Sequence, residues 1–522
     1  MSFKLTYATM FDPPEELHTQ FEKALTETRA TLGKEYDLII GGKEVKAAKK
    51  FEKRSPINTD WVLGVFQKGG ADEANAALAA ARKATQTWGK MPWQERVKLM
   101  RKAVAIIEER IFKIAAALTL EVGKNRLESL GDITEAADLI AYCCDEMERN
   151  NGYVVKMGKD PLVGYNATNT SVLKPYGVWV VISPYNFPTA LSGGPMGAAL
   201  VAGNPVVLKP ASDTPWSVRL LAECIRDAGL PEGAINFVTG GGADLGQALI
   251  DSPEVDGITF TGSYGTGMGI YRSFANYKWP RPTVLELGGK NAVIVSRNAD
   301  LDRAATGIVR SAFGLQGQKC SAASRIYVEA PAYDDLLQKV VSKTNALVLG
   351  DPTKREVYLG PVINKGSYAE FQGYCEEISQ AGGFATGGKV RQDGDFAKGY
   401  FCEPTIGVNV RRDCRLWQHE MFLPITFVEK VGTLDEGMKL ANDVNYGLTS
   451  GFYGTPDEAR WFFENIEAGV NYANRPQGAS TGAWPGFQPF GGWKASGSSG
   501  KNAGGHYYLP LYMHEHSQTI IE

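Results

Sequence analysis

The chain has 522 residues, of which 43% are hydrophobic and 22% charged, with a formal net charge of −3 at pH 7. This is the composition of an ordinary globular protein with two or three domains. The charge is spread without long runs of one sign, which excludes an electrostatic basis for binding nucleic acid or an anionic membrane.

The N-terminal segment and the cysteines indicate the cellular compartment of the protein. The segment Met1–Met10 lacks the basic and apolar regions of a secretory signal, and no apolar run reaches the roughly 18 residues of a membrane span. The seven cysteines include no Cys-x-x-Cys pair, so reduced thiols are expected in place of disulfides. The five histidines are too scattered for a metal site, so we expect no metal. These features predict a cytoplasmic protein.

A helix-rich region is predicted from Ala71 to about Met147, because apolar residues recur there at helical spacing, as in Ala74, Leu78 and Ala81. Glu135 lies in this region, on a helix whose solvent face would carry acidic residues in any case.

Alternating strands and helices follow, with strands predicted at 178–182, 205–208, 235–238 and 257–260 and an amphipathic helix at 217–228. This order is typical of an α/β fold with a parallel sheet wound in both directions. Nucleotides bind in such folds at the carboxyl ends of the strands.

Possible binding groups stand at three of these strand ends. Asn186 lies between Pro184 and Pro188, where its amide could donate to an oxyanion or simply stabilise a turn. Lys209 ends the second strand. The turn at Gly262, before a helix start, could bind a pyrophosphate, although it lacks the Gly-x-Gly-x-x-Gly spacing.

A second α/β series begins near Asn291, with strands predicted at 291–295 and 325–328, and runs to about Gly469. Glu286 stands just before it, at the end of a hydrophobic segment. Apolar neighbours raise the pKa of a carboxylate, which suits a general base, and the alternative is a half-exposed strand residue.

Cys320 lies in the glycine-flanked segment 313–325, directly after Lys319. A neighbouring cation lowers the pKa of a thiol, so this setting favours a nucleophilic thiolate. The alternative is a small core residue.

The segments 154–173 and 497–522 alternate apolar and polar residues with little core of their own. A flexible tail is one interpretation of such a pattern.

Taken together, the chain from about Tyr36 onward resembles the aldehyde dehydrogenase superfamily. Six motifs in order carry the resemblance, namely 184–188, 209–211, 260–263, 286–289, 317–320 and 420–424. The resemblance implies a Rossmann-type NAD(P)-binding domain (1–153 and 174–287), an α/β catalytic domain (288–480) and a small β oligomerisation arm (154–173 and 497–522). It therefore also implies a homo-oligomer.

The resemblance implies a role for each matching residue. Cys320 corresponds to the nucleophile, Glu286 to the base that activates water, and Asn186, with the Cys320 backbone N–H, to the oxyanion hole. The positions that correspond to the binding site for NAD or NADP are Ile182, Ser183, Pro184, Tyr185, Lys209, Ala211, Ser212, Gly242, Phe260, Thr261, Gly262, Ser263, Leu287, Glu420 and Phe422. Leu423 departs from the pattern, because the superfamily usually has glycine there.

Within the superfamily, the chain is similar to the enzymes that oxidise L-glutamate γ-semialdehyde. The matching substrate positions are Glu135, Phe187, Ser321, Gly482, Ala483 and Phe490. Two departures are the extra residues at 475–480 and the leucine at position 287. The alternatives are another semialdehyde, such as succinic semialdehyde, a general aldehyde dehydrogenase, a relative that passes its thioester to coenzyme A, and a catalytically silent binding protein.

Ser212 informs the choice of cofactor. Many NAD-preferring relatives have glutamate at this position, whose charge repels a 2′-phosphate. A serine removes that repulsion, so we expect NADP to be tolerated. The neighbouring Asp213 could restore part of it.

Overall fold

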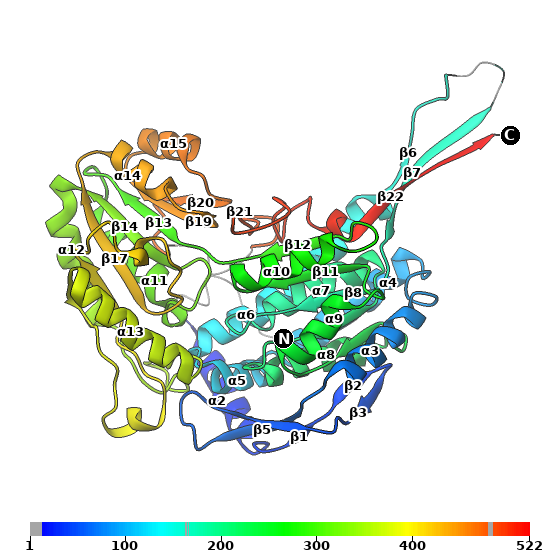
Figure 1. The fold of residues 1–522 in the computed structure, drawn as a ribbon, viewed down its shortest axis with the longest axis horizontal. Coiled ribbons are helices and arrows are strands. Elements are labelled where there is room, and N and C mark those ends of the chain that lie inside the picture. The colour runs from blue at the N-terminus through cyan, green and yellow to red at the C-terminus, as the bar shows by residue number, and fades with distance from the viewer. Residues whose placement is uncertain (1–12, 162–163, 165, 479–483, 522) are drawn as a thin grey trace.

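The structure is a computed structural model that describes residues 13–161, 164, 166–478 and 484–521. The predicted Gly482 and Ala483 lie outside the described residues. Two seven-stranded sheets with helices on their faces make up the body, and a ribbon of three strands projects from it (Figure 1).

The first large sheet has the strand order β12-β11-β8-β9-β10-β2-β3. Its strands are β2 (Leu38–Ile40), β3 (Lys43–Val45), β8 (Trp179–Ile182), β9 (Val206–Lys209), β10 (Ile235–Phe237), β11 (Gly257–Thr261) and β12 (Thr283–Glu286). The last five are parallel, whereas β2 and β3 add antiparallel pairs at one edge. The four predicted strands and the parallel sheet are therefore confirmed.

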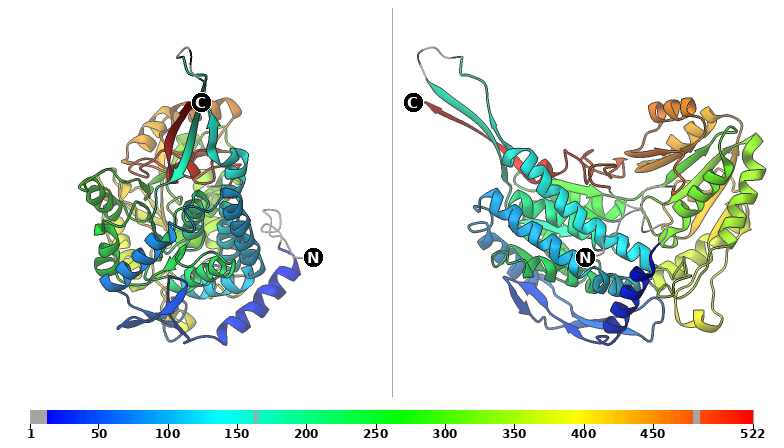
Figure 2. Two further views of the ribbon diagram at one scale, coloured as in Figure 1. Left: turned by 90° about the vertical axis from the view of Figure 1, so that its right-hand side faces the viewer. Right: turned by 180° about the vertical axis from the view of Figure 1, so that it is seen from behind.

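Helices cover both faces of this sheet, as expected for strands that are apolar on both sides. In β8, Trp179 and Val181 enter one core cluster and Val180 enters another. The helices are α3 (Ala71–Ala84), α4 (Trp93–Glu109), α5 (Ile111–Val122), α6 (Arg126–Arg149), α7 (Ala190–Ala202), α8 (Pro215–Asp227), α9 (Gln247–Asp251) and α10 (Tyr264–Ala275). The rear view shows α4 to α6, in blue to cyan, along one side (Figure 2).

An N-terminal helix, α2 (Glu15–Arg29), packs on α5. Beside it lies a small sheet of β1 (Glu35–Tyr36), β4 (Lys50–Arg54) and β5 (Val62–Gln67).

The second large sheet has the order β15-β16-β17-β14-β13-β19-β20. Its strands are β13 (Asn291–Val295), β14 (Ala323–Glu329), β15 (Gly383–Thr386), β16 (Thr405–Val408), β17 (Ile425–Val431), β19 (Thr449–Tyr453) and β20 (Val470–Ala473). Its helices are α11 (Leu301–Phe313), α12 (Ala330–Asn345), α13 (Lys365–Ala381), α14 (Leu434–Asn442) and α15 (Pro456–Asn465). Strands β18 (Tyr446–Gly447) and β21 (Trp493–Lys494) form a separate two-stranded sheet.

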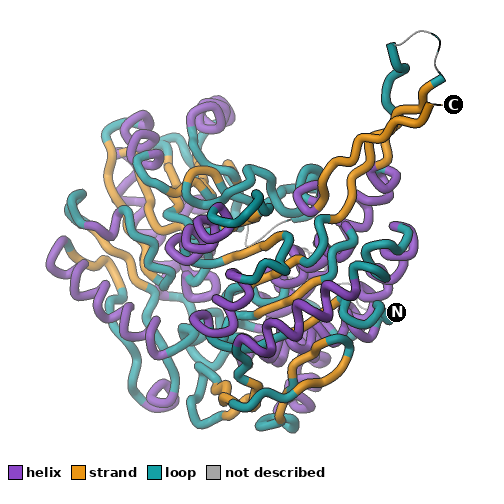
Figure 3. Tube along the Cα trace, turned by 45° about the vertical axis from the view of Figure 1, so that its right-hand side comes forward, coloured by secondary structure: helices purple, strands orange, loops and turns teal. Residues whose placement is uncertain are grey.

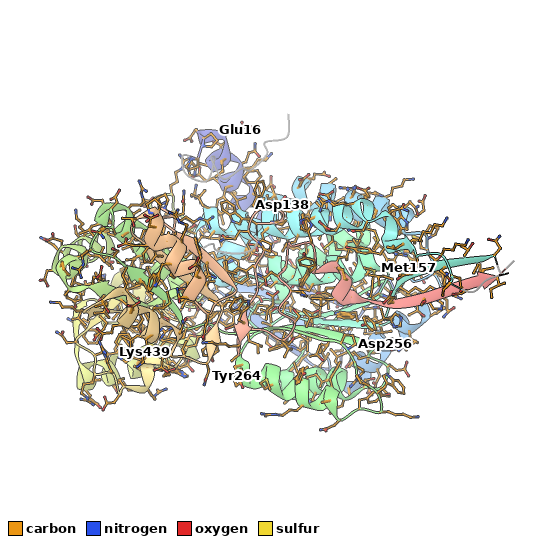
Figure 4. The ribbon with its side chains drawn as sticks, turned by 90° about the horizontal axis from the view of Figure 1, so that it is seen from above. Glu16, Asp138, Met157, Asp256, Tyr264 and Lys439 are labelled. Carbon is orange, nitrogen blue, oxygen red and sulfur yellow. The ribbon has the colours of Figure 1, made fainter. Side chains whose placement is uncertain are left out.

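The projecting ribbon consists of β6 (Val154–Lys156), β7 (Ala167–Pro175) and β22 (Met513–Ile521). The strands run side by side away from the body (Figure 3). Seen from above, Met157 lies on the side of the ribbon, and Lys439 lies at the other end of the molecule (Figure 4). Residues just before β22 do not join the ribbon. Tyr508, Leu509 and Tyr512 are buried in the core instead, because their side chains are large and mostly apolar.

Among the described residues, no helix has the length and apolar character needed to cross a membrane.

Candidate active site

One cavity collects residues that are far apart in the sequence. Five of the predicted site residues line it, namely Cys320, Glu286, Glu135, Phe187 and Phe490. They come from the loop after α11, the end of β12, helix α6, the segment after β8 and the C-terminal region. The sequence-predicted nucleophile and base thus share one space with three of the predicted substrate residues.

A tight left-handed turn positions Cys320. Leu315, Gln316 and Gly317 have φ angles of 48°, 54° and 66°. A side chain at position 317 would overlap the Leu423 carbonyl, so both space and backbone conformation require glycine there. Leu423 is itself buried, with 3% of its surface exposed. The structure thus accommodates a leucine at position 423, where the superfamily usually has glycine.

The electrostatic setting of Cys320 differs from the prediction. Burial raises the pKa of its thiol, and the carboxylates of Glu420 and Glu286 raise it further. Lys319 does not counter this, because its Nζ lies 3.0 Å from Oε1 of Glu128. The expectation that Lys319 favours a thiolate is therefore wrong: the neighbouring cation is neutralised by a carboxylate from another element.

Glu286 is a carboxylate with a strongly perturbed pKa. It ends β12, and burial raises its pKa from 4.5 to about 7. A group with this pKa is ionised about half the time at neutral pH, so it can both accept and release a proton there.

Asn186 and Phe187 follow β8 at the carboxyl edge of the first sheet. Asn186 is buried, with 2% of its surface exposed, and directly precedes the cavity residue Phe187. The ring of Phe187 lies below a buried cation, with Nζ of Lys124 3.7 Å from the ring centroid.

The predicted cofactor residues gather along the carboxyl ends of β8, β9 and β11. Backbone N–H of Ser183 donates to the Lys209 carbonyl at 3.1 Å, which joins the first two ends. Burial lowers the pKa of Lys209 to about 8, although its Nζ donates to the Pro210 carbonyl at 3.2 Å. Ile182 and Lys209 are the last residues of their strands, and Pro184 and Ala211 follow shortly after these ends.

The end of β11 leads directly into a helix. Phe260 and Thr261 are its last residues, Gly262 forms the turn, and Ser263 caps α10 by accepting from Thr266 N–H. The predicted strand, turn and helix start are thus confirmed. A helix N-terminus at a strand end is suited to an anion. Gly242 begins the short helical turn 242–246, with open space where a Cβ would stand.

Ser212 and Asp213 lie in the loop after β9. Ser212 is exposed, and its Oγ donates to the Gly240 carbonyl at 3.4 Å. The Asp213 carboxylate lies 3.8 Å from the buried Nζ of Lys53 and accepts from the Asn364 amide at 3.0 Å. Its charge is therefore largely offset, which weakens any repulsion that Asp213 could restore.

Glu420 lies just before β17, in the part of the chain that forms the second large sheet. Its Oε1 accepts the Gly289 N–H at 2.8 Å, and burial raises its pKa to about 7. A Cβ on Gly288 would overlap the carboxylate, so this glycine is required for the close approach. Phe422 has a φ of 56°, and its ring lies edge-on to Tyr185 with centroids 5.8 Å apart. Leu287, beside Glu286, is buried.

The substrate positions are only partly brought together. Glu135 lies on the cavity side of α6, so the alternative of a purely solvent-facing acid is wrong. Ser321 is buried next to Cys320, and its carbonyl accepts from the Thr449 hydroxyl at 3.3 Å. Within the described residues, neither Ser321 nor Asn186 is part of the cavity lining.

Sequence reasoning missed seven residues that line the cavity. They are Leu139, Ala190, Leu191, Gly194, Pro195, Ala503 and Tyr508. The first five follow from helical spacing on α6 and α7 once the two helices are known to touch. Tyr508 had no sequence signal, because it lies in a segment assigned to the arm. In the described ranges, no cluster of three or more His, Cys, Asp or Glu could hold a metal ion.

Comparison with known proteins agrees with this geometry. The chain is 38% identical over 516 residues to 1-pyrroline-5-carboxylate dehydrogenase 2 of Halalkalibacterium halodurans, with 97% of each chain covered. It is 35% identical to the structure of a mutant of 1-pyrroline-5-carboxylate dehydrogenase from Thermus thermophilus, with a TM-score of 0.92 and 97% coverage of each chain. A Thermus structure of that enzyme with bound NAD matches equally well, at 35% identity, a TM-score of 0.92 and 97% coverage of each chain. The model of the aldehyde dehydrogenase family matches residues 44–517, and the chain therefore belongs to this family.

Proposed function

We propose that this protein is a 1-pyrroline-5-carboxylate dehydrogenase, which oxidises L-glutamate γ-semialdehyde to L-glutamate with NAD or NADP as hydride acceptor. The observation that carries the proposal is the shared cavity, which places Cys320 and Glu286 beside Glu135, Phe187 and Phe490. The relatives named above support it, since they are named as that enzyme and the match covers nearly their full length.

The first step is attack of sulfur on the aldehyde carbon. Because burial and nearby carboxylates keep the Cys320 thiol protonated, the attack needs a base, and Glu286 lines the same cavity with a pKa of about 7. As the carbon–sulfur bond forms, the carbonyl oxygen gains charge. The Asn186 amide and the Cys320 backbone N–H are the donors assigned to that oxyanion.

The cofactor site uses residues of the first sheet. The strand ends at Ile182, Lys209 and Thr261, the capped start of α10 and the open glycine at 242 suit a dinucleotide. When bound, the cofactor supplies the acceptor for the hydride that leaves the substrate carbon. Glu420 is the residue assigned to hold its nicotinamide ribose.

Glu286 then acts a second time. After its proton has passed to solvent, the carboxylate takes a proton from a water that attacks the Cys320 thioester. The carbon–sulfur bond breaks and the carboxylic acid leaves. Glu135 lines the cavity and is the carboxylate suited to the substrate α-ammonium.

The projecting ribbon supports a homo-oligomer. Val154, Val155, Ile520 and Ile521 are 45%, 55%, 61% and 55% exposed on its strands. Exposed apolar strands are normally covered by another chain, so we propose that the ribbon pairs with a second copy.

The substrate assignment predicts a clear preference among aldehydes. Initial rates of NAD(P)H formation are measured without coenzyme A for glutamate γ-semialdehyde, succinic semialdehyde and propanal. We expect kcat/KM for the amino-acid aldehyde to exceed the other two by about 100-fold. Only this substrate carries both an α-carboxylate and an α-ammonium group, and the proposed site binds both. Equal rates would leave a general aldehyde dehydrogenase, and a strict need for coenzyme A would indicate an acylating enzyme.

The cofactor assignment predicts a switch at Ser212. Ser212→Glu should shift the NADP to NAD ratio of kcat/KM at least about tenfold toward NAD, because juxtaposed like charges cost several kcal/mol. Ser212→Gln, of the same size but neutral, is the control and should leave the ratio within about twofold. An unchanged ratio in Ser212→Glu would mean that this side chain does not face the 2′-position.

A further inference from the structure

Helix α6 carries two carboxylates one turn apart, each paired with a buried lysine. Glu128 Oε1 lies 3.0 Å from Nζ of Lys319, and Asp132 Oδ2 lies 2.8 Å from Nζ of Lys124. The side chains of Lys124 and Asp132 have no exposed surface, and that of Lys319 is 3% exposed. Within the next two turns the same helix contributes Glu135 and Leu139 to the cavity.

The first pair contacts the nucleophile loop. Lys319 directly precedes Cys320, and the other Glu128 oxygen accepts the Leu315 N–H at 3.2 Å. Leu315 is the first residue of the left-handed turn that leads to Cys320. Glu128 therefore holds this loop at both ends, before and after the turn.

The second pair contacts a different part of the cavity lining. Lys124 Nζ lies 3.7 Å from the centroid of the Phe187 ring. The remaining oxygen of Asp132 accepts from the Thr189 hydroxyl at 2.8 Å and from the Ala190 N–H at 2.7 Å. Ala190 begins α7 and, like Phe187, lines the cavity.

Stability alone does not account for these ion pairs. Burying two charges costs several kcal/mol per ion, and apolar residues of similar volume often serve at least as well. Glycines already allow α6 and α7 to pack closely, since a Cβ on Gly193 or Gly194 would lie 2.9 Å or 2.8 Å from Ala136 or Leu139. The helices thus have a tight apolar interface of their own.

We propose that the two ion pairs of α6 position these two parts of the cavity lining separately. The Glu128–Lys319 pair fixes the nucleophile loop, and the Lys124–Asp132 pair fixes Phe187 and the start of α7, which determines which aldehydes fit. All four are positioning residues that act through Cys320 or Phe187. This inference rests on the proposed function, because it assigns specificity to the same cavity.

Two double variants test the division of roles. Glu128→Gln/Lys319→Met and Lys124→Met/Asp132→Asn each remove one pair, leave no unpaired charge and retain an amide oxygen as acceptor for the backbone N–H. Each serves as the matched control for the other. The readouts are kcat and KM for glutamate γ-semialdehyde and for propanal, together with the thermal midpoint and NAD affinity of each folded variant.

We expect the Glu128–Lys319 variant to lose about ten- to 100-fold in kcat with both aldehydes alike, because small displacements of a reacting atom have effects of that size. The Lys124–Asp132 variant should instead lower the ratio of kcat/KM for the amino-acid aldehyde over propanal by about tenfold, mainly through KM. Lys319→Arg, which retains the charge, should keep most of kcat.

Three results would overturn the inference. They are equal losses for both pairs and both substrates, a change in thermal midpoint alone, or a substrate ratio that moves in the Glu128–Lys319 variant and not in the other. If a double variant does not fold, the isosteric single variants Glu128→Gln and Asp132→Asn must show the same division, or the inference fails. Failure of the proposed function is distinguishable, because the unmodified enzyme would then show no preference for the amino-acid aldehyde.

Discussion

Replacement of Cys320 by alanine should abolish turnover while leaving cofactor binding intact. The thioester needs a sulfur at this position, and we expect kcat to fall on the order of 10⁴-fold or more, as for other covalent nucleophiles. NAD(P)H formation measures the loss. Quenching of tryptophan fluorescence on titration with NAD measures the binding that remains, because the cofactor residues at the strand ends are untouched.

Cys414→Ser is the control for this variant. Cys414 is partly exposed and carries a free thiol, and it does not line the cavity. The Cys414→Ser variant should remain fully active. A Cys320→Ala enzyme that keeps even roughly a tenth of the activity would remove the proposed mechanism, since the alanine offers no group that can form a thioester.

Replacement of Glu286 by glutamine should block the second half of the reaction more than the first. A positioned general base contributes about 10²- to 10⁴-fold, so steady-state turnover should fall by that factor. Glutamine also removes a negative charge that raises the pKa of the Cys320 thiol, so the thiol can lose its proton to solvent and hydride transfer still occurs once per site. A burst of about one NAD(P)H per active site, followed by a slow phase, is the expected signature of a trapped thioester.

The pH dependence follows from the raised pKa of Glu286. Burial moves this pKa from 4.5 to about 7, so the carboxylate that accepts protons is depleted below that pH and fully formed above it. In the unmodified enzyme, kcat should rise with pH through about 7 and then level off. The inflection should be absent in Glu286→Gln, and an inflection that persists there would assign it to another group.

Local sequence patterns predicted most of the first sheet. Strand residues such as Val180 and Val207 are apolar on both faces of the sheet, and turn residues bound them on each side, so β8, β9, β10 and β11 appear within one or two residues of their predicted limits. The identity of Cys320 and Glu286 as cavity residues also followed, because each stands in an unusual setting within its own segment.

Long-range pairings were beyond the sequence. Lys319 was expected to act on its neighbour Cys320, but its partner Glu128 lies 191 residues away in the chain. The charge of a side chain can be read locally, whereas its neutralisation depends on how helices meet. The same limit applies to Asp213, whose charge is offset by Lys53, and to Glu135, whose orientation depends on the packing of α6 against α7.

The position of Tyr508 has a consequence for synthesis on the ribosome. This tyrosine lines the cavity, and Tyr512, which donates to its hydroxyl at 2.8 Å, packs on Trp179 of the first sheet with ring centroids 4.6 Å apart. Both residues leave the exit tunnel only after the two large sheets have been translated. Because domains fold during synthesis at about 5–20 residues per second, the nascent chain spends several seconds with Cys320 beside an unfinished wall. A chain that stops shortly before Tyr508 would therefore lack one of the residues that line the cavity around Cys320.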